Sequence, residues 1–165
     1  MYVAGDIKTT KMSANIVIRE GSIAEAVLVS QQIPEFINPH SEEEYQKCLS
    51  TVPHLILIAI DRETQQPVGF KVGYQSTQKS IFYSWMGGIL PQYRRMGIAQ
   101  RLANTQEQWA RDHHYTHIRF KTRNRLKQML IFALSNGFDI LEVIRKDTQA
   151  DYRILLQKEI LSNNP

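Results

Sequence analysis

The residues with the clearest chemistry in this sequence are Arg-Arg-Met-Gly-Ile-Ala at positions 94–99. The first amides of a helix lack intrahelical partners and lie at the positive end of the helix dipole, so a helix that starts here can bind an anion. Gly97 allows close approach, and Ala99 is also small. Three arginines can add charge: Arg94, Arg95 and Arg101. The amides predicted to hold a pyrophosphate are those of Met96, Gly97, Ile98, Ala99 and Gln100.

The sequence around this run carries an excess of positive charge. Positions 91–127 hold nine Lys or Arg residues and only two acidic residues, Glu107 and Asp112, whereas the net charge of the whole chain is +4. Such clustering favours an anionic partner, either a phosphorylated cofactor or a nucleic acid. A basic face that is simply solvated would show the same clustering, so the motif has to distinguish these cases.

A strand and a helix must meet at positions 94–99 for the amides to face a phosphate group. The apolar run 81–86 predicts the strand. A stripe at steps of three and four residues follows, made of Ile98, Leu102, Thr105 and Trp109. It predicts a helix that ends near His113. The run therefore lies where a strand delivers the chain to a helix start.

The other elements follow from the same periodicities. Ser41 followed by Glu44 matches a capping box, which predicts a helix over 41–49. Two more helices are predicted, one over 23–30 and one with its apolar face on Leu126, Met129, Leu130, Ala133 and Leu134, opened by Asn124 and closed by Asn136-Gly137. The predicted strands are 16–19, 54–61, 68–74, 81–86, 117–121, 138–145 and 152–158. This order indicates an α/β (α+β) fold with helices on a mixed sheet and a parallel, right-handed unit from 81 to 121.

Gly87-Gly88 interrupts a run that otherwise has the composition of a strand. Glycine weakens a flat strand and often marks a bulge or a close approach of backbones. Two interpretations are open, a strand bulge and a simple glycine turn.

Arg94-x-x-Gly97-x-Ala99, preceded by Leu90-Pro91 and followed by Leu102, resembles the acetyl-CoA signature Arg/Gln-x-x-Gly-x-Gly/Ala of the GNAT family of N-acetyltransferases. Asn124 and Gly137-Phe138 resemble the second motif of the family, and the order of elements is similar to the family from Ile16 to Lys158. The resemblance implies the GNAT fold, a mixed, mostly antiparallel sheet of about seven strands flanked by four helices and splayed between the strands at 81–86 and 117–121.

The resemblance also implies how the co-substrate acetyl-CoA binds. Its pyrophosphate is expected on 94–100, and its pantetheine arm is expected in the splay, beside the backbone of Gly88, Ile89 and Leu90. Gly87-Gly88 would then be the family's strand bulge. A backbone amide there could receive the thioester oxygen as it gains charge. Asn124 is expected to contact pantetheine, and no metal is expected.

The catalytic groups of the family have no clear match. An ammonium with a pKa of about 10.4 must lose a proton before it attacks a thioester. The family often uses a carboxylate on the strand at 81–86, which contains no acid here. We expect Glu35, in the loop 33–40, to bind or deprotonate the amine, and Tyr83 or Ser84 to hold a water. Ala133 stands where many members have a tyrosine that protonates the leaving thiolate.

These features predict an enzyme that transfers acetyl from acetyl-CoA to a primary amine of a small molecule or peptide. The alternative is a catalytically weak acyl-CoA-binding module of the same fold, suggested by the missing acid and tyrosine. A third class, an RNA-binding module on 91–127, ranks lowest, and nucleic acid is not the expected partner. His113, His114 and His117 share no helix face, so a zinc site is not expected either.

Length and composition favour a single domain over 16–165, preceded by an N-terminal extension over 1–15 that could be flexible. The longest apolar run, 55–60, is too short to span a bilayer, so no membrane partner is expected. The lone Cys48 agrees with a reducing, cytoplasmic location. Dimers are frequent in the resembled family, and a homodimer is one option for this chain.

Overall fold

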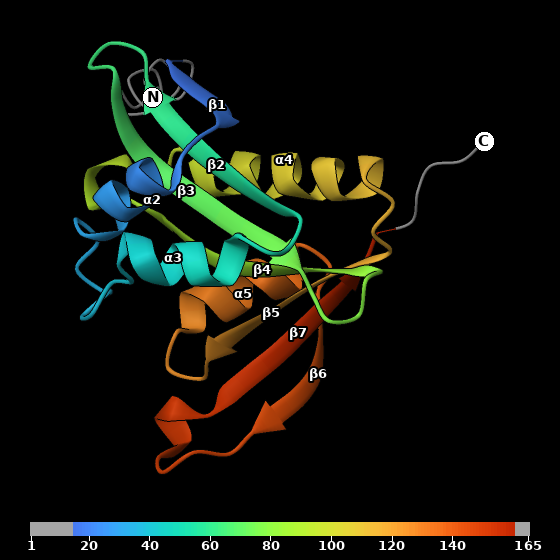
Figure 1. Ribbon diagram of the computed structural model, residues 1–165. Coiled ribbons are helices and arrows are strands. Elements are labelled where there is room, and N and C mark those ends of the chain that lie inside the picture. Colours follow the sequence, from blue (N-terminus) through green and yellow to red (C-terminus); the bar gives the residue numbers. More distant parts are fainter. Residues whose placement is uncertain (1–14, 161–165) are drawn as a thin grey trace, which may run out of the picture. The chain divides into compact units, whose positions relative to one another are not determined.

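The computed structural model describes residues 15–160 (Figure 1), so the predicted extension 1–15 lies outside the described residues except for Asn15. The strands are β1 (Ile16–Glu20), β2 (His54–Asp61), β3 (Gln66–Gln75), β4 (Ile81–Ile89), β5 (His117–Arg123), β6 (Asp139–Ile144) and β7 (Arg153–Glu159). The α-helices are α2 (Ile23–Ser30), α3 (Glu42–Leu49), α4 (Ile98–Asp112) and α5 (Lys127–Ser135). Two short 3-10 helices are Pro91–Tyr93 and Gln149–Asp151.

The seven strands form one hydrogen-bonded order, β1-β2-β3-β4-β5-β7-β6. β4 and β5 run parallel, whereas β1 with β2, β2 with β3, β5 with β7 and β6 with β7 are antiparallel. The predicted fold class, a mixed and mostly antiparallel sheet with four helices, is confirmed. The parallel register joins 81–83 to 117–119, although both strands continue beyond it.

Residues 15–160 form two compact units, and β4 and α4 each contribute to both. The first unit contains 15–74 and 86–106, and the second contains 75–85 and 107–160. The predicted cofactor residues from Gly88 to Gln100 therefore belong to the first unit, together with Glu35. The other predicted site residues, Tyr83, Ser84 and Asn124, belong to the second.

The helices of the first unit begin where the sequence provides side-chain caps. Ser41 and Glu44 form the predicted capping box at the start of α3, and Ser22 and Glu25 form another at the start of α2. α2 and α3 lie beside each other, and α2 contacts β2 (Figure 1). The cap at Ser41 closes the loop that carries Glu35, because that loop runs from the end of α2 to the start of α3.

β2 is buried on both faces, because every residue from Leu55 to Asp61 is buried. One face lies against the α2 side, where Ile58 meets Gly21 and where Phe70 of β3 makes an edge-on contact with Phe36. A strand covered on both faces needs a second layer, and α4 is the remaining helix in the described part of this unit. Its inward residues, Ile98 and Leu102, are buried.

The second unit has its own apolar core. Phe82 packs against Trp109 and Tyr115, with ring centroids 5.3 and 5.2 Å apart. A second cluster joins α5 to the strands and contains Ala133, Ile154 and Leu156, with Phe120, Leu130 and Phe138 packed against it. Both clusters connect helix faces to strand faces, as the periodicity of the sequence predicts.

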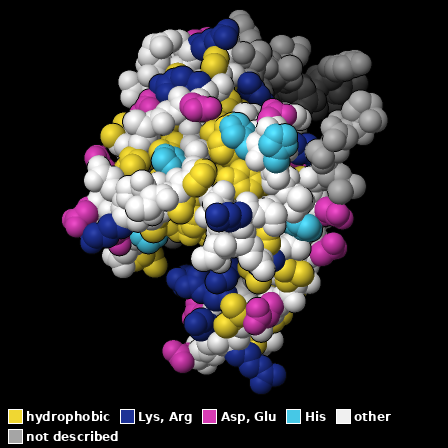
Figure 2. All heavy atoms as spheres, turned by 45° about the vertical axis from the view of Figure 1, so that its right-hand side comes forward, with side chains coloured by type: hydrophobic (Ala, Val, Ile, Leu, Met, Phe, Trp, Pro, Cys, Tyr) yellow, Lys and Arg dark blue, Asp and Glu magenta, His cyan; other side chains and the backbone are white. Residues whose placement is uncertain are grey.

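The predicted apolar face of α5 is only partly correct. Leu130 and Ala133 face the core, but Leu126, Met129 and Leu134 are 41%, 43% and 49% exposed. α5 begins at Lys127 and is only nine residues long, so few of its positions reach the strands. Figure 2 shows apolar and basic side chains side by side in the lower part of the molecule, where β6 and β7 lie in Figure 1.

Two boundaries differ from the sequence prediction. β4 continues through Gly87-Gly88 to Ile89, and neither glycine has a positive φ, so the interpretation as a glycine turn is wrong. Asn124 does not open α5, because the helix begins three residues later and Leu126 is its N-cap residue. Gly137 has a φ of 84° and closes α5, as predicted.

The capping box of α3 gives a stability prediction. Ser41→Ala removes the hydroxyl that accepts from the Glu44 amide at 3.3 Å, and we expect the free energy of unfolding to fall by about 1 kcal/mol. Urea denaturation followed by circular dichroism measures this change. Ser50→Ala at the other end of the same helix is the control, and an equal loss in both variants would contradict the capping role.

Candidate functional site

The chain turns sharply between β4 and α4. Arg95 and Gly97 both have positive φ angles, 61° and 76°, which lie in the left-handed region. The Arg101 amide donates to the Gly97 carbonyl at 3.1 Å, so α4 starts directly after Gly97. The first amides of the helix therefore have no carbonyl one turn earlier to accept from them.

Gly97 leaves open space in front of this helix start. A Cβ placed on Gly97 would have no atom within 4 Å, whereas the neighbouring Ile98 is 1% exposed and anchors the helix. Ala99, like Gly97, is exposed and small. An uncovered row of backbone amides at the positive end of a helix suits a pyrophosphate, so these residues fit the phosphates of acetyl-CoA.

A tyrosine holds the turn onto the end of β2. The Tyr93 hydroxyl donates to Oδ2 of Asp61 at 2.8 Å, and the Glu63 amide donates to Oδ1 at 2.8 Å. The Tyr93 hydrogen bond lowers the pKa of Asp61. The sequence prediction missed this contact, although an aspartate that ends an apolar strand and a tyrosine in Pro-Gln-Tyr were visible signals.

Arg94 joins the turn to the loop between α2 and α3. Its terminal nitrogens donate to both carboxylate oxygens of Glu35 at 2.7 and 2.9 Å, and its Nε donates to the Ile89 carbonyl at 3.1 Å. The pair lowers the pKa of Glu35 and raises that of Arg94. Glu35 thus remains ionised at neutral pH, and it neutralises the charge that Arg94 was predicted to offer a phosphate.

The loop between α2 and α3 rests directly on the end of β4. A Cβ on Gly88 would lie 2.5 Å from Ile33 Cδ1 and 3.6 Å from the ring of Phe36, so residue 88 has to be small. The Leu90 amide donates to the Val68 carbonyl at 2.9 Å. The amide of Leu90 is thus occupied by β3, and Gly88 and Ile89 are left as the predicted pantetheine strand.

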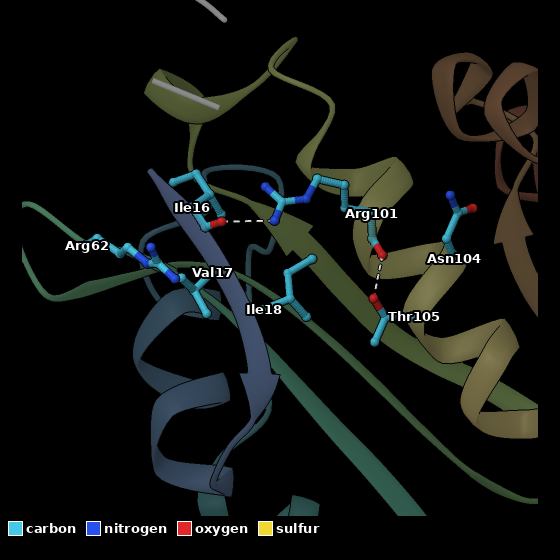
Figure 3. Close-up of a pocket in the computed structure, with 7 residues that line it drawn as sticks. All are labelled: Ile16, Val17, Ile18, Arg62, Arg101, Asn104 and Thr105. Carbon is cyan, nitrogen blue, oxygen red and sulfur yellow. Dashed lines mark hydrogen bonds between the residues drawn. The ribbon is translucent and has the colours of Figure 1, made fainter. Parts of the chain in front are cut away.

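The other two arginines of the motif have different surroundings. Arg95 is exposed beside the turn, whereas Arg101 donates to the Ile16 carbonyl at 2.9 Å (Figure 3). A pocket of about 550 Å³ lies at this edge, lined by Ile16, Val17, Ile18, Arg62, Arg101, Asn104 and Thr105. It contains none of the predicted residues from Gly88 to Gln100, so it is not the predicted phosphate seat.

In the second unit, Tyr83 lies at the end of the parallel register, opposite Arg119. Burial raises the pKa of Tyr83, and a hydrogen bond from the Lys121 backbone opposes this shift. Ser84 is buried, 9% exposed. Both residues lie close to the point where β4 and β5 stop pairing, and their role in holding a water stays a prediction.

Asn124 lies in the turn after β5. Its Nδ2 donates to the Gln149 carbonyl at 3.0 Å, and its Oδ1 accepts from Lys127 Nζ at 3.0 Å. The side chain therefore ties the start of α5 to the 3-10 helix before β7. Its predicted contact with pantetheine stays a prediction.

His113 packs against its own helix. The His113 ring stacks on Trp109 at 3.8 Å, and its Nδ1 lies 2.8 Å from the Trp109 carbonyl. Within residues 15–160, no group of three or more His, Cys, Asp or Glu side chains could hold a metal ion. In the same part of the chain, none of the helices has the length and apolar character needed to cross a bilayer. The expected cytoplasmic location stays a prediction.

Solved structures with the same fold are acetyltransferases of several kinds. The ribosomal-protein-S18-alanine N-acetyltransferase from Escherichia coli has a TM-score of 0.75 and 13% identity, over 91% of this chain and 98% of that one. Arabidopsis thaliana NAA60 in complex with a bisubstrate analogue has a TM-score of 0.74 and 14% identity, over 90% and 99%. The phosphinothricin acetyltransferase from Sinorhizobium meliloti, in complex with AcCoA, has a TM-score of 0.72 and 14% identity, over 88% and 89%.

A search of curated proteins found no match to this sequence. The model of the acetyltransferase (GNAT) family matches residues 26–138, a segment that contains the loop of Glu35, the end of β4 and the start of α4. This match covers more than half of the chain and includes the whole predicted phosphate seat. The chain is therefore a member of the GNAT acetyltransferase family, an acyltransferase by fold and by family.

Proposed function

We propose that this protein transfers the acetyl group of acetyl-CoA to a primary amine of a small molecule or a peptide, by direct attack in a ternary complex. The observation that carries the proposal is the uncovered helix start at Gly97, which is joined to the end of β4 by the 3-10 helix Pro91–Tyr93 and a short turn. It combines a site for phosphates with a strand end against which a thioester can lie. The predicted single domain over 16–165 is proposed as the unit that performs this reaction.

In the proposed complex, the amides of residues 96–100 hold the pyrophosphate, and Arg95 adds positive charge from the exposed side of the turn. The backbone of Gly88 and Ile89 supports the pantetheine arm, and the contact of Asn124 with pantetheine stays a prediction. Acetyl-CoA supplies the activated acetyl group. A neighbour of the same fold in complex with AcCoA supports this choice of co-substrate.

The proposed acceptor site lies at the loop between α2 and α3, where Glu35 presents an ionised carboxylate. Because its pKa is lowered, Glu35 is a weak base, and a cationic amine would share its carboxylate oxygens with Arg94 through their remaining lone pairs. Proton removal would then pass to a water held by Tyr83 or Ser84. Neighbours of this fold include enzymes named for a protein alanine and for phosphinothricin, which supports both classes of acceptor.

A catalytically weak acyl-CoA-binding module is the second candidate. It is favoured by the absence of a carboxylate among the residues of β4 and by Ala133, which is 1% exposed in the core of the second unit and provides no proton donor. Both candidates bind acetyl-CoA at the same place. Turnover distinguishes them.

The turnover test uses purified protein, acetyl-CoA and a panel of primary amines that includes peptides with a free N-terminus, lysine peptides, polyamines and aminoglycosides. We expect release of free CoA, followed with a thiol reagent, for at least one class of amine. An acetylated product of the expected mass must accompany it. Tight binding of acetyl-CoA without product from any amine would leave only the binding module.

Gly97→Glu tests the phosphate seat. The substitution places bulk and negative charge before the helix start, so we expect the affinity for CoA, measured by calorimetry, to fall by at least about tenfold. Gly97→Gln has the same positive φ strain and similar size without the charge, so it should lose less. An unchanged affinity in both variants would show that the phosphates bind elsewhere.

Glu35→Gln tests the acceptor site. Loss of the carboxylate should raise the KM for the cationic amine by about tenfold and change kcat less, because the lost interaction serves binding. The affinity for CoA should stay the same or rise, since Arg94 gains free charge. Arg94→Gln is the comparison, and equal losses of CoA affinity in both variants would mean that Glu35 only holds Arg94.

A further inference from the structure

Lys71 on β3 is a partly buried cation that the proposed reaction has not yet used. Among residues 15–160 its ammonium has no hydrogen-bond or ion-pair partner, and part of the residue still reaches solvent. Desolvation alone lowers the pKa of Lys71 to about 8. An unpaired ammonium in such surroundings is unfavourable for folding, so its retention calls for a functional explanation.

The strand alternation shows where Lys71 projects. Phe70 contacts Phe36 on the α2 side of the sheet, at a ring-centroid distance of 6.3 Å. Successive residues of a strand point to opposite faces, so Lys71 projects to the face opposite Phe36.

Lys71 also lies beside the strand that is proposed to hold pantetheine. Its Cγ is 3.6 Å from the position that a Cβ would have on Gly87, and its Cα is 3.7 Å from the same point. The absence of a side chain at Gly87 therefore leaves room for Lys71 to lie along β4, next to Gly88. The strand neighbours of Lys71 are Leu57 of β2 and Gly87 of β4. Neither has an ionisable side chain, so neither can donate a proton in place of Lys71.

We propose that the ammonium of Lys71 is the proton donor to the thiolate of CoA as it leaves, a role that rests on the proposed function. The neutral amine attacks the acetyl carbon, the carbon–sulfur bond breaks, and its electron pair goes to sulfur. Lys71 gives one proton to that sulfur and becomes neutral. The new amide loses its extra proton to water on the acceptor side, and Lys71 regains a proton from solvent.

The acidities of the two groups match. A free thiol has a pKa of about 8.5, and Lys71, at about 8, is acidic enough to donate to a thiolate near neutral pH. An ordinary exposed lysine, at about 10.4, would hold its proton too tightly to be an efficient donor. Lys71 can therefore protonate the leaving thiolate, which Ala133 cannot do.

The placement of the two charged residues agrees with the direction of the reaction. Glu35 belongs to the loop whose Ile33 and Phe36 lie against Gly88, whereas Lys71 lies beside Gly87, on the opposite face of the strand. An amine that enters by Glu35 and a thiolate that leaves by Lys71 would use opposite faces of β4. The nucleophile and the leaving group then do not compete for space.

The kinetic test compares Lys71→Met with Lys71→Arg. Met fills a similar volume and cannot donate, so kcat should fall on the order of 10²-fold while the affinity for acetyl-CoA changes less than about twofold. Arg keeps the charge but holds its proton at neutral pH, so it should be as slow as Met. Lys47→Met, at an exposed position of α3, is the matched control.

Three kinetic outcomes would overturn the proposal: unchanged kcat in Lys71→Met, full recovery in Lys71→Arg, or a loss that appears only in acetyl-CoA affinity. Thermal unfolding shows whether each variant is folded. If the wild-type protein acetylates none of the amines, the proposed function fails by itself, and a binding measurement then decides the position of Lys71.

That measurement is the pKa of the CoA thiol bound to the protein, followed by the ultraviolet absorbance of the thiolate. A nearby ammonium favours the thiolate, so the thiol pKa should be lower on the wild-type protein and on Lys71→Arg than on Lys71→Met. Equal values on the wild-type protein and Lys71→Met would place Lys71 away from the sulfur. That result would overturn the proposal whether or not an amine acceptor is found.

Discussion

The first turn of α4 has to leave its amides uncovered, and the surrounding contacts are arranged around that constraint. The start of α4 is held in place by contacts of the residues that precede it. Here Tyr93 is bound to Asp61 at the end of β2, and Arg94 is bound to the Ile89 carbonyl and to Glu35. The turn is thus fixed at two points, while Gly97 itself contacts nothing in front of it. Rigid neighbours allow an open anion site without a flexible loop.

Much of the fold, including the helix start that carries the proposed phosphate seat, could be predicted from sequence, because it depends on local patterns. The capping box at Ser41, the start of α4 and the glycine that closes α5 involve residues only a few positions apart. Pairs distant in sequence were not predictable. Glu35 and Arg94 are 59 residues apart, and nothing in their local sequence shows that they meet.

The apolar face of α5 illustrates a different limit of sequence patterns. Helical periodicity identifies side chains that share a face, but it does not show how much of that face a neighbouring strand covers. Leu130 and Ala133 are covered, and Met129 is not. Lys71 is a related case, because a lysine within an apolar strand pattern looks like an exposed position until the layers on both faces are known.

Gly88 has a consequence for how the acceptor preference of this protein can change. Its missing side chain and the Ile33 side chain occupy one continuous space, with only 2.5 Å between Ile33 Cδ1 and the position of a Cβ on residue 88. A larger residue on the strand therefore requires the end of the Ile33 side chain to move, or a smaller residue in the loop. In evolution or in engineering, these two positions have to vary together, so new acceptors will come from paired substitutions more readily than from single ones.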